Sequence, residues 1–300
     1  MRKIINKIAQ LLVLPAICAV ILSSYAPSFA QSLSPRFKFS IDGFYSDLFD
    51  SPMGVFVDGK NKEVYVVDVG KGEVFVFDTM GTPLFRFGLS SGVETPIDVA
   101  AAKDRIYVSE EGKPYVEVFN LRGERVGELT VPGTEFSPGR MDVDGEGNIY
   151  VVNRKLGECY VFDSSGVFIR TIGKGLFSLS GVAVEGGGDR VYLIAPFYQG
   201  RVIHLYKKTG EFIASFEGIE DRGGTLGLPT SAKVDSSGNL WVVDSLKGVV
   251  VYDRDWKKAA FFGRGGASVD RLDFPVDVDF DGEGMIYIVD KERKSLRVFK

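Results

Sequence analysis

Residues 138–173 read PGRMDVDGEGNIYVVNRKLGECYVFDSSGVFIRTIG. This stretch consists of short runs of β-branched and aromatic residues, and turns such as Asp144-Gly145-Glu146-Gly147 separate the runs. The alternation of short apolar runs with turns containing Gly and Asp is typical of successive β-hairpins. The stretch therefore predicts antiparallel strands and no helix of useful length.

Six copies of this unit follow one another from about residue 50 to the end of the chain. Each copy opens with an apolar strand, usually ending in an acid, and successive copies begin 41–50 residues apart, at Pro52, Pro96, Pro138, Leu179, Pro229 and Pro275. A period of this length suits a four-stranded propeller blade. We therefore predict an all-β fold, a six-bladed β-propeller of four-stranded antiparallel blades.

The sixth copy ends at Lys300, directly after its third strand, so its fourth strand must come from elsewhere. Residues Arg36–Ile41 read RFKFSI and resemble the fourth strands of other copies, such as LFRF at Leu84–Phe87. Pairing of this segment beside Leu296–Phe299 would complete the last blade and leave no open edge between the two chain ends. We expect residues 31–300 to form one propeller domain closed in this way.

The repeat also resembles a known family. The patterns P-x-G-V-x-V-D, N-x-Y-V-x-D and V-x-V-F-D-x-x-G are similar to the NHL repeat of six-bladed propellers, of the secreted bacterial type, and the best copies are Pro52–Gly88, Pro138–Gly173 and Pro229–Gly263. The Asn-Asn-Arg of that family is absent between the second and third strands, where Gly70-Lys71-Gly72 and Ser245-Leu246-Lys247 stand instead. The resemblance implies the fold, but a fold alone does not specify a function.

Residues 1–30 have the pattern of a secretory signal peptide. Three basic residues lead into the apolar run Leu11–Leu22, and Ser28-Phe29-Ala30 precedes the expected cleavage site. The apolar run is short for a membrane span, and no later segment approaches the roughly 20 apolar residues that a span needs. We expect export to the periplasm or the outside medium, with no transmembrane segment in the mature protein.

Charge and composition exclude two kinds of function. The formal net charge is −4, and because residues 1–30 hold three basic and no acidic residues, the remainder carries −7. An acidic domain argues against a nucleic-acid partner bound through its phosphates. His204 is the only histidine, which excludes a metal site built from several imidazoles.

The first strand of each copy should surround the central channel of the propeller. Alternate residues of these strands would bring four acids and two bases to one opening, and they are Asp98, Arg140, Asp142, Lys233, Asp277 and Asp279. Clustered charges mark functional sites only in some proteins. Two interpretations are open: ion pairs among the six side chains, or a small polar ligand or metal held at the channel mouth.

The fourth copy departs most from the repeat. Its second strand ends in Ala195-Pro196-Phe197-Tyr198-Gln199 instead of an acid or amide, and the long connection Glu217–Leu228 follows. Both features should lie on the same rim, and loops on a rigid scaffold often carry recognition. Phe197 and Tyr198 resemble interface anchors, although a Pro-aromatic turn that packs on its own blade fits equally well.

Several other residues have structural interpretations. His204 aligns with Val76, Val118, Val161, Val251 and Val298 of the third strands, which indicates a core position, and Cys159 aligns with small apolar residues. The acids and amide that end the second strands usually bond backbone N–H groups in turns; they are Asp68, Glu110, Asn153, Asp244 and Asp290.

The run Asp277-Val278-Asp279-Phe280-Asp281-Gly282 matches the first half of a calcium loop. Its twelfth position is Ile288 where such a loop has an acid. We therefore interpret the run as the first strand and hairpin turn of the last blade, and we expect no resident cofactor, with calcium as the alternative.

The sequence contains no nucleophile motif and no phosphate loop. We therefore expect a binding or scaffolding module that recognises a protein, a peptide or another ligand in the cell envelope or outside the cell. Two alternatives are a channel-site enzyme and a component of a larger envelope complex. Some six-bladed propellers resembling this one act as lactonases or lyases; a calcium-dependent version would use Asp98, Asp142, Asn153 and Asp277.

Overall fold

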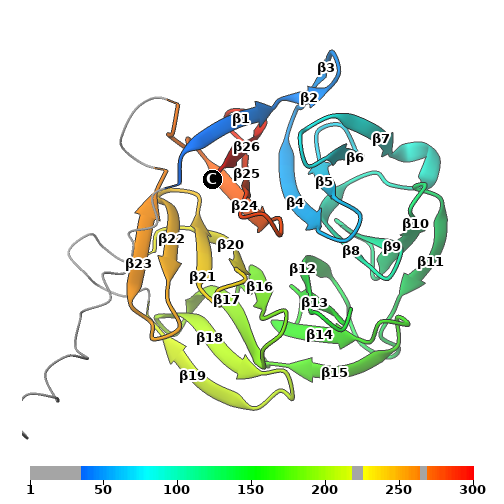
Figure 1. Ribbon diagram of the computed structural model, residues 1–300. Coiled ribbons are helices and arrows are strands. Elements are labelled where there is room, and N and C mark those ends of the chain that lie inside the picture. Colours follow the sequence, from blue (N-terminus) through cyan, green and yellow to red (C-terminus); the bar gives the residue numbers. More distant parts are fainter. Residues whose placement is uncertain (1–34, 218–225, 264–268) are drawn as a thin grey trace, which may run out of the picture. The chain divides into compact units, whose positions relative to one another are not determined.

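The computed structural model describes residues 35–217, 226–263 and 269–300. These residues form six four-stranded antiparallel sheets arranged as blades of a ring, together with a two-stranded hairpin and one 3-10 turn, η1 (Leu89–Ser91) (Figure 1). Among them, no helix is long and apolar enough to cross a membrane. The predicted six-bladed propeller is confirmed. The expected signal peptide, residues 1–30, lies outside the described residues.

Each blade is a meander that runs from the central channel outward. The strands are, in blade 1, β4 (Pro52–Asp58), β5 (Glu63–Asp68), β6 (Glu73–Asp78) and β7 (Pro83–Phe87); in blade 2, β8 (Pro96–Ala102), β9 (Arg105–Glu110), β10 (Val116–Asn120) and β11 (Arg125–Leu129); in blade 3, β12 (Pro138–Val143), β13 (Ile149–Asn153), β14 (Glu158–Phe162) and β15 (Phe168–Ile172). In blade 4 they are β16 (Gly181–Val184), β17 (Arg190–Tyr198), β18 (Arg201–Lys207) and β19 (Phe212–Phe216); in blade 5, β20 (Pro229–Val234), β21 (Leu240–Asp244), β22 (Gly248–Tyr252) and β23 (Lys258–Phe262). Blade 6 comprises β24 (Pro275–Phe280), β25 (Ile286–Asp290), β26 (Ser295–Phe299) and β1 (Phe37–Ile41).

The ring closes as the sequence predicts. Strand β1 pairs antiparallel with β26, with Phe37 opposite Phe299 and Ile41 opposite Leu296. Beyond the strands, Arg36 and Lys300 exchange two backbone hydrogen bonds of 2.9 and 3.0 Å. The last blade therefore has its fourth strand, and the two ends of the described chain lie together.

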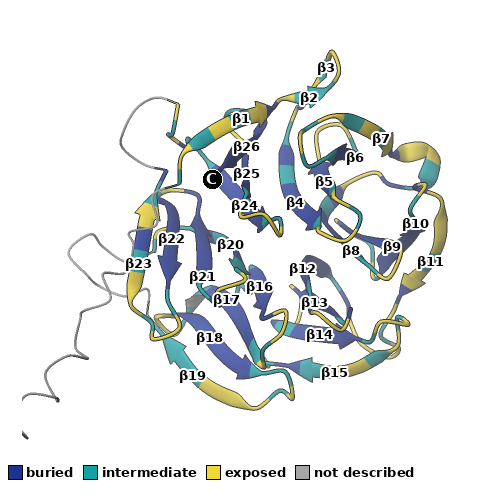
Figure 2. Ribbon diagram, in the orientation of Figure 1, coloured by how far each residue is buried: buried dark blue, intermediate teal, exposed yellow. Residues whose placement is uncertain are grey.

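The core lies between neighbouring blades. The second strand of each blade buries an aromatic residue near its start, and these residues are Tyr65, Tyr107, Tyr150, Tyr192, Trp241 and Tyr287. Figure 2 shows the inner strands largely buried and the outermost strands alternately exposed. Because each aromatic side chain buries roughly 150–250 Å², this packing fixes one blade on the next.

The register of blade 4 differs from the sequence alignment. In blade 3, Tyr150 pairs with Val161, whereas in blade 4 the equivalent Tyr192 pairs with Leu205. His204 therefore takes the place of Tyr160 on the third strand, and its predicted alignment with Val161 is wrong by one residue. The cause is a longer hairpin, in which β17 continues to Tyr198 before it turns.

The turns and loops of the ring form two rims. The 1–2 rim carries the turns between first and second strands and between third and fourth strands. The 2–3 rim carries the turns between second and third strands and the connections between blades. The connection from β1 to β4 includes a projecting hairpin of β2 (Gly43–Phe44) and β3 (Asp47–Leu48) (Figure 1), and Asp47 forms an ion pair of 2.7 Å with Lys71 on the 2–3 rim.

Candidate functional site

The structure brings the six predicted channel residues together in two layers. In the first layer, Arg140 Nη1 lies 3.1 Å from Asp98 Oδ1 and 3.2 Å from Asp277 Oδ2. Its Nη2 donates hydrogen bonds to the carbonyl oxygens of Met53, at 2.8 Å, and Val276, at 3.0 Å. The buried guanidinium is thus held by two carboxylates and two backbone carbonyls from the first strands of three blades, which are blades 1, 2 and 6.

The second layer is built around Lys233. Its Nζ lies 2.7 Å from Asp142 Oδ1 and 3.2 Å from Asp279 Oδ2, and it also lies 4.9 Å from the centre of the Phe56 ring. The ring face adds a favourable cation–π contact. Each base is therefore shared by two acids, and all six charges have a partner.

The four aspartates also join neighbouring blades. Each accepts a hydrogen bond from a backbone N–H on the first strand of the next blade, and the pairs are Asp98 with Met141 (2.7 Å), Asp142 with Val184 (2.7 Å), Asp277 with Val55 (2.9 Å) and Asp279 with Val57 (2.9 Å). Buried backbone donors must be satisfied if the fold is to be stable. The carboxylates therefore have a structural role before any ligand is considered.

Burial and ion pairing have opposite effects on the pKa values of these acids. Burial raises the pKa of Asp98 to about 7, although Arg140 opposes the shift. Burial likewise raises the pKa of Asp279 to about 6 against the effect of Lys233. For Lys233, burial lowers the pKa, but Asp142 and Asp279 outweigh it and the net pKa is raised. The two bases therefore stay charged at neutral pH.

The space left inside the channel is small. The cavity lined by Asp98, Arg140, Lys233 and Asp277 has a volume of about 10 Å³, which is room for about one water molecule. Ligand pockets usually enclose hundreds of Å³. The cluster can hold the ring together but offers no space for a substrate.

The residues considered for calcium do not fit a divalent ion. Arg140 and Lys233 occupy the positions between the carboxylates, and Asn153 lies on the 2–3 rim, where it bonds the backbone of Glu135 and Ser137. No cluster of three His, Cys, Asp or Glu side chains suited to a metal occurs among the described residues. In the calcium-like run, Asp281 accepts the N–H groups of Glu283 and Met285, as an acid in a hairpin turn does.

The residues that end the second strands act as predicted from the turn chemistry. Asp68 accepts the N–H groups of Asp50, at 2.7 Å, and Ser51, at 2.8 Å, and so fixes the connection that enters its own blade. The same arrangement recurs at Glu110, Asn153, Asp244 and Asp290. Each of these side chains accepts hydrogen bonds from backbone N–H groups, so they do not form a ring of unbonded acids.

Blade 4 lacks this corner acid because Ala195 stands in its place. Ser180 compensates, with its N–H donating to the carbonyl of Ile194 at 2.8 Å and its hydroxyl to Ile194 and Pro229 at 3.2 Å. Without the acid, the hairpin extends farther along the 2–3 rim and turns at Gln199 and Gly200, with φ of 51° and 74°. These angles suit a tight type I′ hairpin turn.

Of the two predicted rim anchors, the structure describes one side chain. Tyr198 is half-buried and its ring lies 5.5 Å from that of His204 in an edge-on contact. His204 is buried, and burial lowers its pKa, so it is neutral at pH 7. The side chain of Phe197 and residues 218–225 of the following connection lie outside the described residues.

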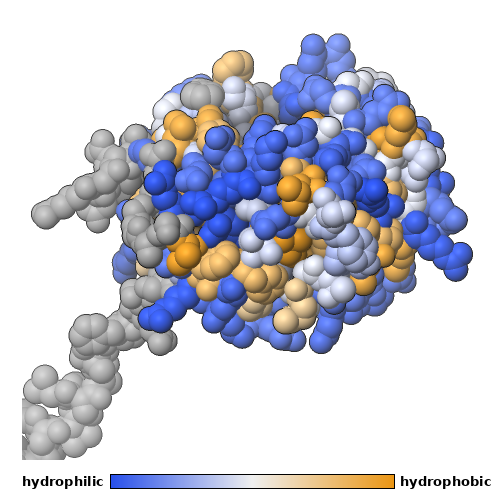
Figure 3. All heavy atoms as spheres, turned by 90° about the horizontal axis from the view of Figure 1, so that it is seen from above, coloured by the Kyte–Doolittle hydropathy of each residue, from blue (hydrophilic) through white to orange (hydrophobic). Residues whose placement is uncertain are grey.

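Exposed apolar side chains are more numerous on the 2–3 rim than on the 1–2 rim, a feature that the sequence did not reveal. Eight large apolar residues of the described chain are exposed in the loops of this rim, from Tyr45 at 76% to Val69 at 36%, and they are Tyr45, Leu48, Val69, Leu89, Leu156, Phe177, Leu246 and Val269. In the turns of the 1–2 rim the exposed residues of this kind are Met80 and Val167. Figure 3 shows a side view of the ring, on which hydrophobic patches lie within a hydrophilic surface.

Comparisons with known proteins agree with this architecture. No protein-family model matches the chain. The E3 ubiquitin-protein ligase NHLRC1 of Mus musculus is 25% identical over 273 residues, which cover 83% of this chain and 66% of that protein. The chain therefore spans slightly less than two thirds of the length of this relative.

Solved structures share the fold at low sequence identity. A gluconolactonase from Xanthomonas campestris superposes with a TM-score of 0.67 at 16% identity, covering 88% of this chain and 94% of that one. A virginiamycin B lyase from Staphylococcus aureus gives 0.61 at 12% identity, covering 89% and 99%, and a streptogramin B lyase gives 0.63 at 10%, covering 87% and 96%. The fold and its filled channel define a six-bladed β-propeller. The repeats and the mouse relative, at 25% identity, support its description as an NHL-repeat propeller.

Proposed function

We propose that this propeller is a protein-binding module that docks a partner on its 2–3 rim. The observation that carries the proposal is the set of eight exposed apolar side chains on that rim. The 2–3 rim therefore offers a partner several exposed apolar side chains, and aromatic residues such as Tyr45 and Phe177 are frequent anchors in interfaces. The fold and the NHL-repeat relative support a binding or scaffolding role.

The channel gives no support to the enzyme alternative. The gluconolactonase and the lyases share the fold with this chain, but fold likeness does not transfer an activity. Here the central acids are bonded to Arg140, Lys233 and backbone N–H groups, and the remaining cavity admits about one water molecule. We therefore propose a binding module without catalytic activity, without a resident metal and without a nucleic-acid partner.

The proposal also includes export through residues 1–30 to the periplasm or the outside medium.

The test is partner recovery with paired variants. Tagged protein is crosslinked mildly in its native host and purified, and the eluate is examined by mass spectrometry of proteins and by elemental analysis. Phe177→Asp and Leu156→Asp should abolish recovery of a recurrent partner, whereas Met80→Asp, which adds the same charge on the opposite rim, should retain it. The double variant Phe197→Ala/Tyr198→Ala tests whether the blade 4 hairpin belongs to the same surface.

Equal partner recovery by the rim variants and Met80→Asp would contradict the proposed surface. Stoichiometric metal in a protein without any partner would instead favour the enzyme alternative. Fractionation of the same cells tests export, because retention of an uncleaved chain in the cytoplasm contradicts it.

A further inference from the structure

The acid that ends the second strand of blade 2 has a second acid beside it. Glu110 ends β9, and Glu117 on β10 lies on the same face of the sheet, because its partner Val108 is two residues before Glu110. In the other blades the pairing places residues of other types at the position of Glu117, and they are Phe75, Tyr160, His204, Val250 and Arg297. Of the six blades described, blade 2 is therefore the one that has two carboxyl groups at this corner.

Lys113, in the turn after β9, joins the two carboxyl groups. Its Nζ lies 2.5 Å from Glu110 Oε1 and 3.1 Å from Glu117 Oε1. It also donates a hydrogen bond of 2.7 Å to the carbonyl oxygen of Gly92, in the connection between blades 1 and 2. A Cβ at Gly92 would lie 3.7 Å from Glu117 Oε1, so this connection passes directly over the Glu117 carboxyl group.

The connection between blades 1 and 2, residues 88–95, is held from the same corner. Glu110 Oε2 accepts the N–H groups of Glu94, at 2.7 Å, and Thr95, at 2.8 Å. With the bond from the lysine, three backbone groups of the connection depend on this cluster. Leu89 of the connection is 73% exposed and belongs to the 2–3 rim.

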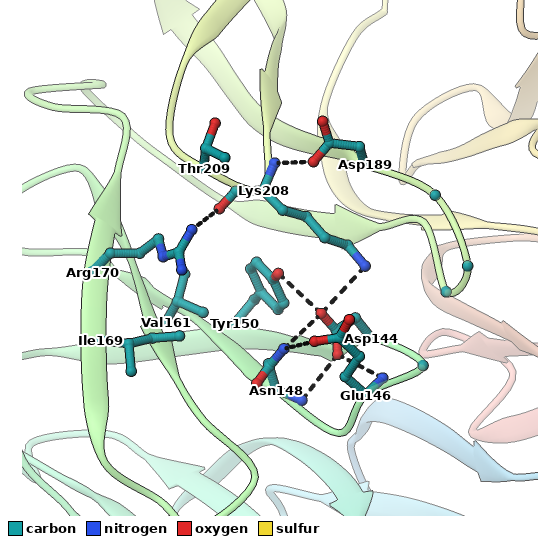
Figure 4. Close-up of a pocket in the computed structure, with 14 residues that line it drawn as sticks. Asp144, Glu146, Asn148, Tyr150, Val161, Ile169, Arg170, Asp189, Lys208 and Thr209 are labelled. Carbon is teal, nitrogen blue, oxygen red and sulfur yellow. Dashed lines mark hydrogen bonds and ion pairs between the residues drawn. The ribbon is translucent and has the colours of Figure 1, made fainter.

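Glu117 is buried, and one of its oxygens has no hydrogen-bond donor. Its Oε1 lies 3.1 Å from Lys113 Nζ and 3.0 Å from Arg125 Nε, whereas its Oε2 is buried without a partner. Among the buried acids of the described residues, Glu117 alone has such an oxygen. Asp144, in the hollow of about 560 Å³ between blades 3 and 4, bonds Asn148 through both of its oxygens (Figure 4). A bare oxygen is costly for a buried carboxylate, whereas a protonated carboxyl group can donate from it.

The charges around Glu117 balance when Glu117 is protonated. Arg125 on β11 also bonds Glu128, an exposed acid on the same strand, at 3.0 Å. Two acids, Glu110 and Glu128, then face two bases, and ionised Glu117 would add an unbalanced negative charge. From blade 1 an apolar ring packs on this face, since Phe87 lies 4.9 Å from the ring of Phe119. The titratable groups around Glu117 are Glu110 on β9, Lys113 and Tyr115 in the following turn, Arg125 and Glu128 on β11, and the exposed Glu94 on the connection.

The pKa values agree with this geometry. Burial raises the pKa of Glu117 to about 7, and the hydrogen bond with Glu110 acts in the same direction against the effect of Lys113. Burial also acts to raise the pKa of Glu110, but hydrogen bonds from Glu117, Lys113 and the backbone outweigh it and lower the pKa. For Lys113, burial lowers the pKa, but the two carboxyl groups outweigh it and the net pKa is raised. The proton of the cluster is therefore on Glu117.

We propose that Glu117 and Glu110 form a proton-dependent switch, which holds the connection between blades 1 and 2 when Glu117 is protonated and releases it when Glu117 is ionised. Ionised Glu117 repels Glu110 and attracts Lys113, and both effects weaken the bonds of these groups to the connection. The connection is the part that opens, because it lies largely at the surface. The switch alters the 2–3 rim around Leu89, but it does not rest on the proposed partner, since its test needs the chain alone.

The experiment measures amide hydrogen exchange of the whole chain by NMR at pH 6, 7 and 8, as protection factors corrected for the intrinsic effect of pH. The protection of the Glu94 and Thr95 amides should fall about tenfold from pH 6 to pH 8. Linkage gives this fold-change for an acid with a pKa near 7 in the closed state and the usual 4.5 in the open state. In Glu117→Gln, whose amide cannot ionise and can donate to Glu110, the fall should disappear.

The same corner of blade 1 is the control within the chain. There Asp68 accepts the N–H groups of Asp50 and Ser51, and Phe75 stands at the position of Glu117. We expect a smaller fall at these two amides, because they report only opening of the whole ring. This comparison within the unmodified chain decides the proposal even if the variant does not fold.

Three results would overturn the proposal. The first is protection at the two blade 2 amides that does not change between pH 6 and pH 8. The second is a fall of equal size at the two blade 1 amides, which would assign the effect to the whole ring. The third is an undiminished fall in folded Glu117→Gln, which would assign the proton to another group.

Discussion

Replacement of Arg140 by methionine tests the structural role of the channel charges. Both Asp98 and Asp277 contact the same Nη1 atom, so the variant leaves two buried carboxylates facing one another without a cation. It also removes the donors to the carbonyls of Met53 and Val276. Loss of one partner from a buried ion pair costs about 3–5 kcal/mol. We expect a loss of this size in the free energy of unfolding, a large share of the roughly 5–15 kcal/mol of a typical domain.

Urea denaturation followed by tryptophan fluorescence measures the effect, because urea does not screen charge as guanidinium does. The destabilisation by Arg140→Met should be greatest near pH 8 and smaller near pH 5. At the lower pH one of the two carboxyls can take up a proton and relieve the repulsion, since the pKa of Asp98 is about 7 even with Arg140 in place. Removal of the cation raises that pKa further.

Lys60→Met is the control, because Lys60 Nζ bonds one carboxylate, Asp104, at 2.9 Å and both side chains are exposed. Such exposed pairs contribute at most about 1 kcal/mol. The structural role assigned to Arg140 is refuted if the two variants lose equal stability at pH 8. A loss from Arg140→Met that does not change with pH would refute the electrostatic cause.

Three other predictions concern the ring as a whole. Deletion of Arg36–Ile41 should abolish soluble expression, because blade 6 loses its fourth strand; normal yield and melting of this variant would contradict ring closure by β1. Cys159 should resist thiol reagents such as dithionitrobenzoate in the folded protein and react after urea unfolding, since it is buried and burial raises its pKa; fast labelling of the native chain would contradict this. The urea midpoint of unfolding should decrease as the pH rises from 5 to 8, because Asp98 and Asp279 have pKa values near 7 and 6 in the folded protein, above the usual 3.8. These two acids therefore bind protons more tightly in the folded state than in the unfolded state. A midpoint that does not change with pH, and is the same in Asp98→Asn, would show that these acids do not control the pH dependence.

Local sequence was sufficient to predict the blades and their closure. Each blade is formed by short strands and turn acids that lie close together in the sequence. Asp68, for example, accepts hydrogen bonds from the backbone at the start of its own blade. The pairing of β1 with β26 followed from counting strands, because the last copy lacks one. The gathering of the six channel charges followed from the alternation of side chains along the first strands.

Features that depend on pairing across the structure were harder to predict. His204 was misplaced because the alignment assumed equal hairpins, whereas the absence of a corner acid at Ala195 lets β17 run on to Tyr198 and shifts the pairing. The sequence also left open whether the channel charges pair with one another, which side-chain geometry decides. The hollow of about 560 Å³ between the turns at residues 144–148 and 186–189 was not predicted either, because it depends on how two blades lie against each other.

The pairing of Arg36 with Lys300 has a mechanical consequence. Arg36 and Lys300 lie at the same end of the β1–β26 ladder, where they exchange the outermost hydrogen bonds. A force that pulls the ends apart therefore loads these bonds one after another, as a zipper opens, and does not shear the whole ladder at once. If the chain is tethered at one end and loaded at the other, blade 6 yields first and at low force. Load applied between two surface loops of other blades would spare this seam.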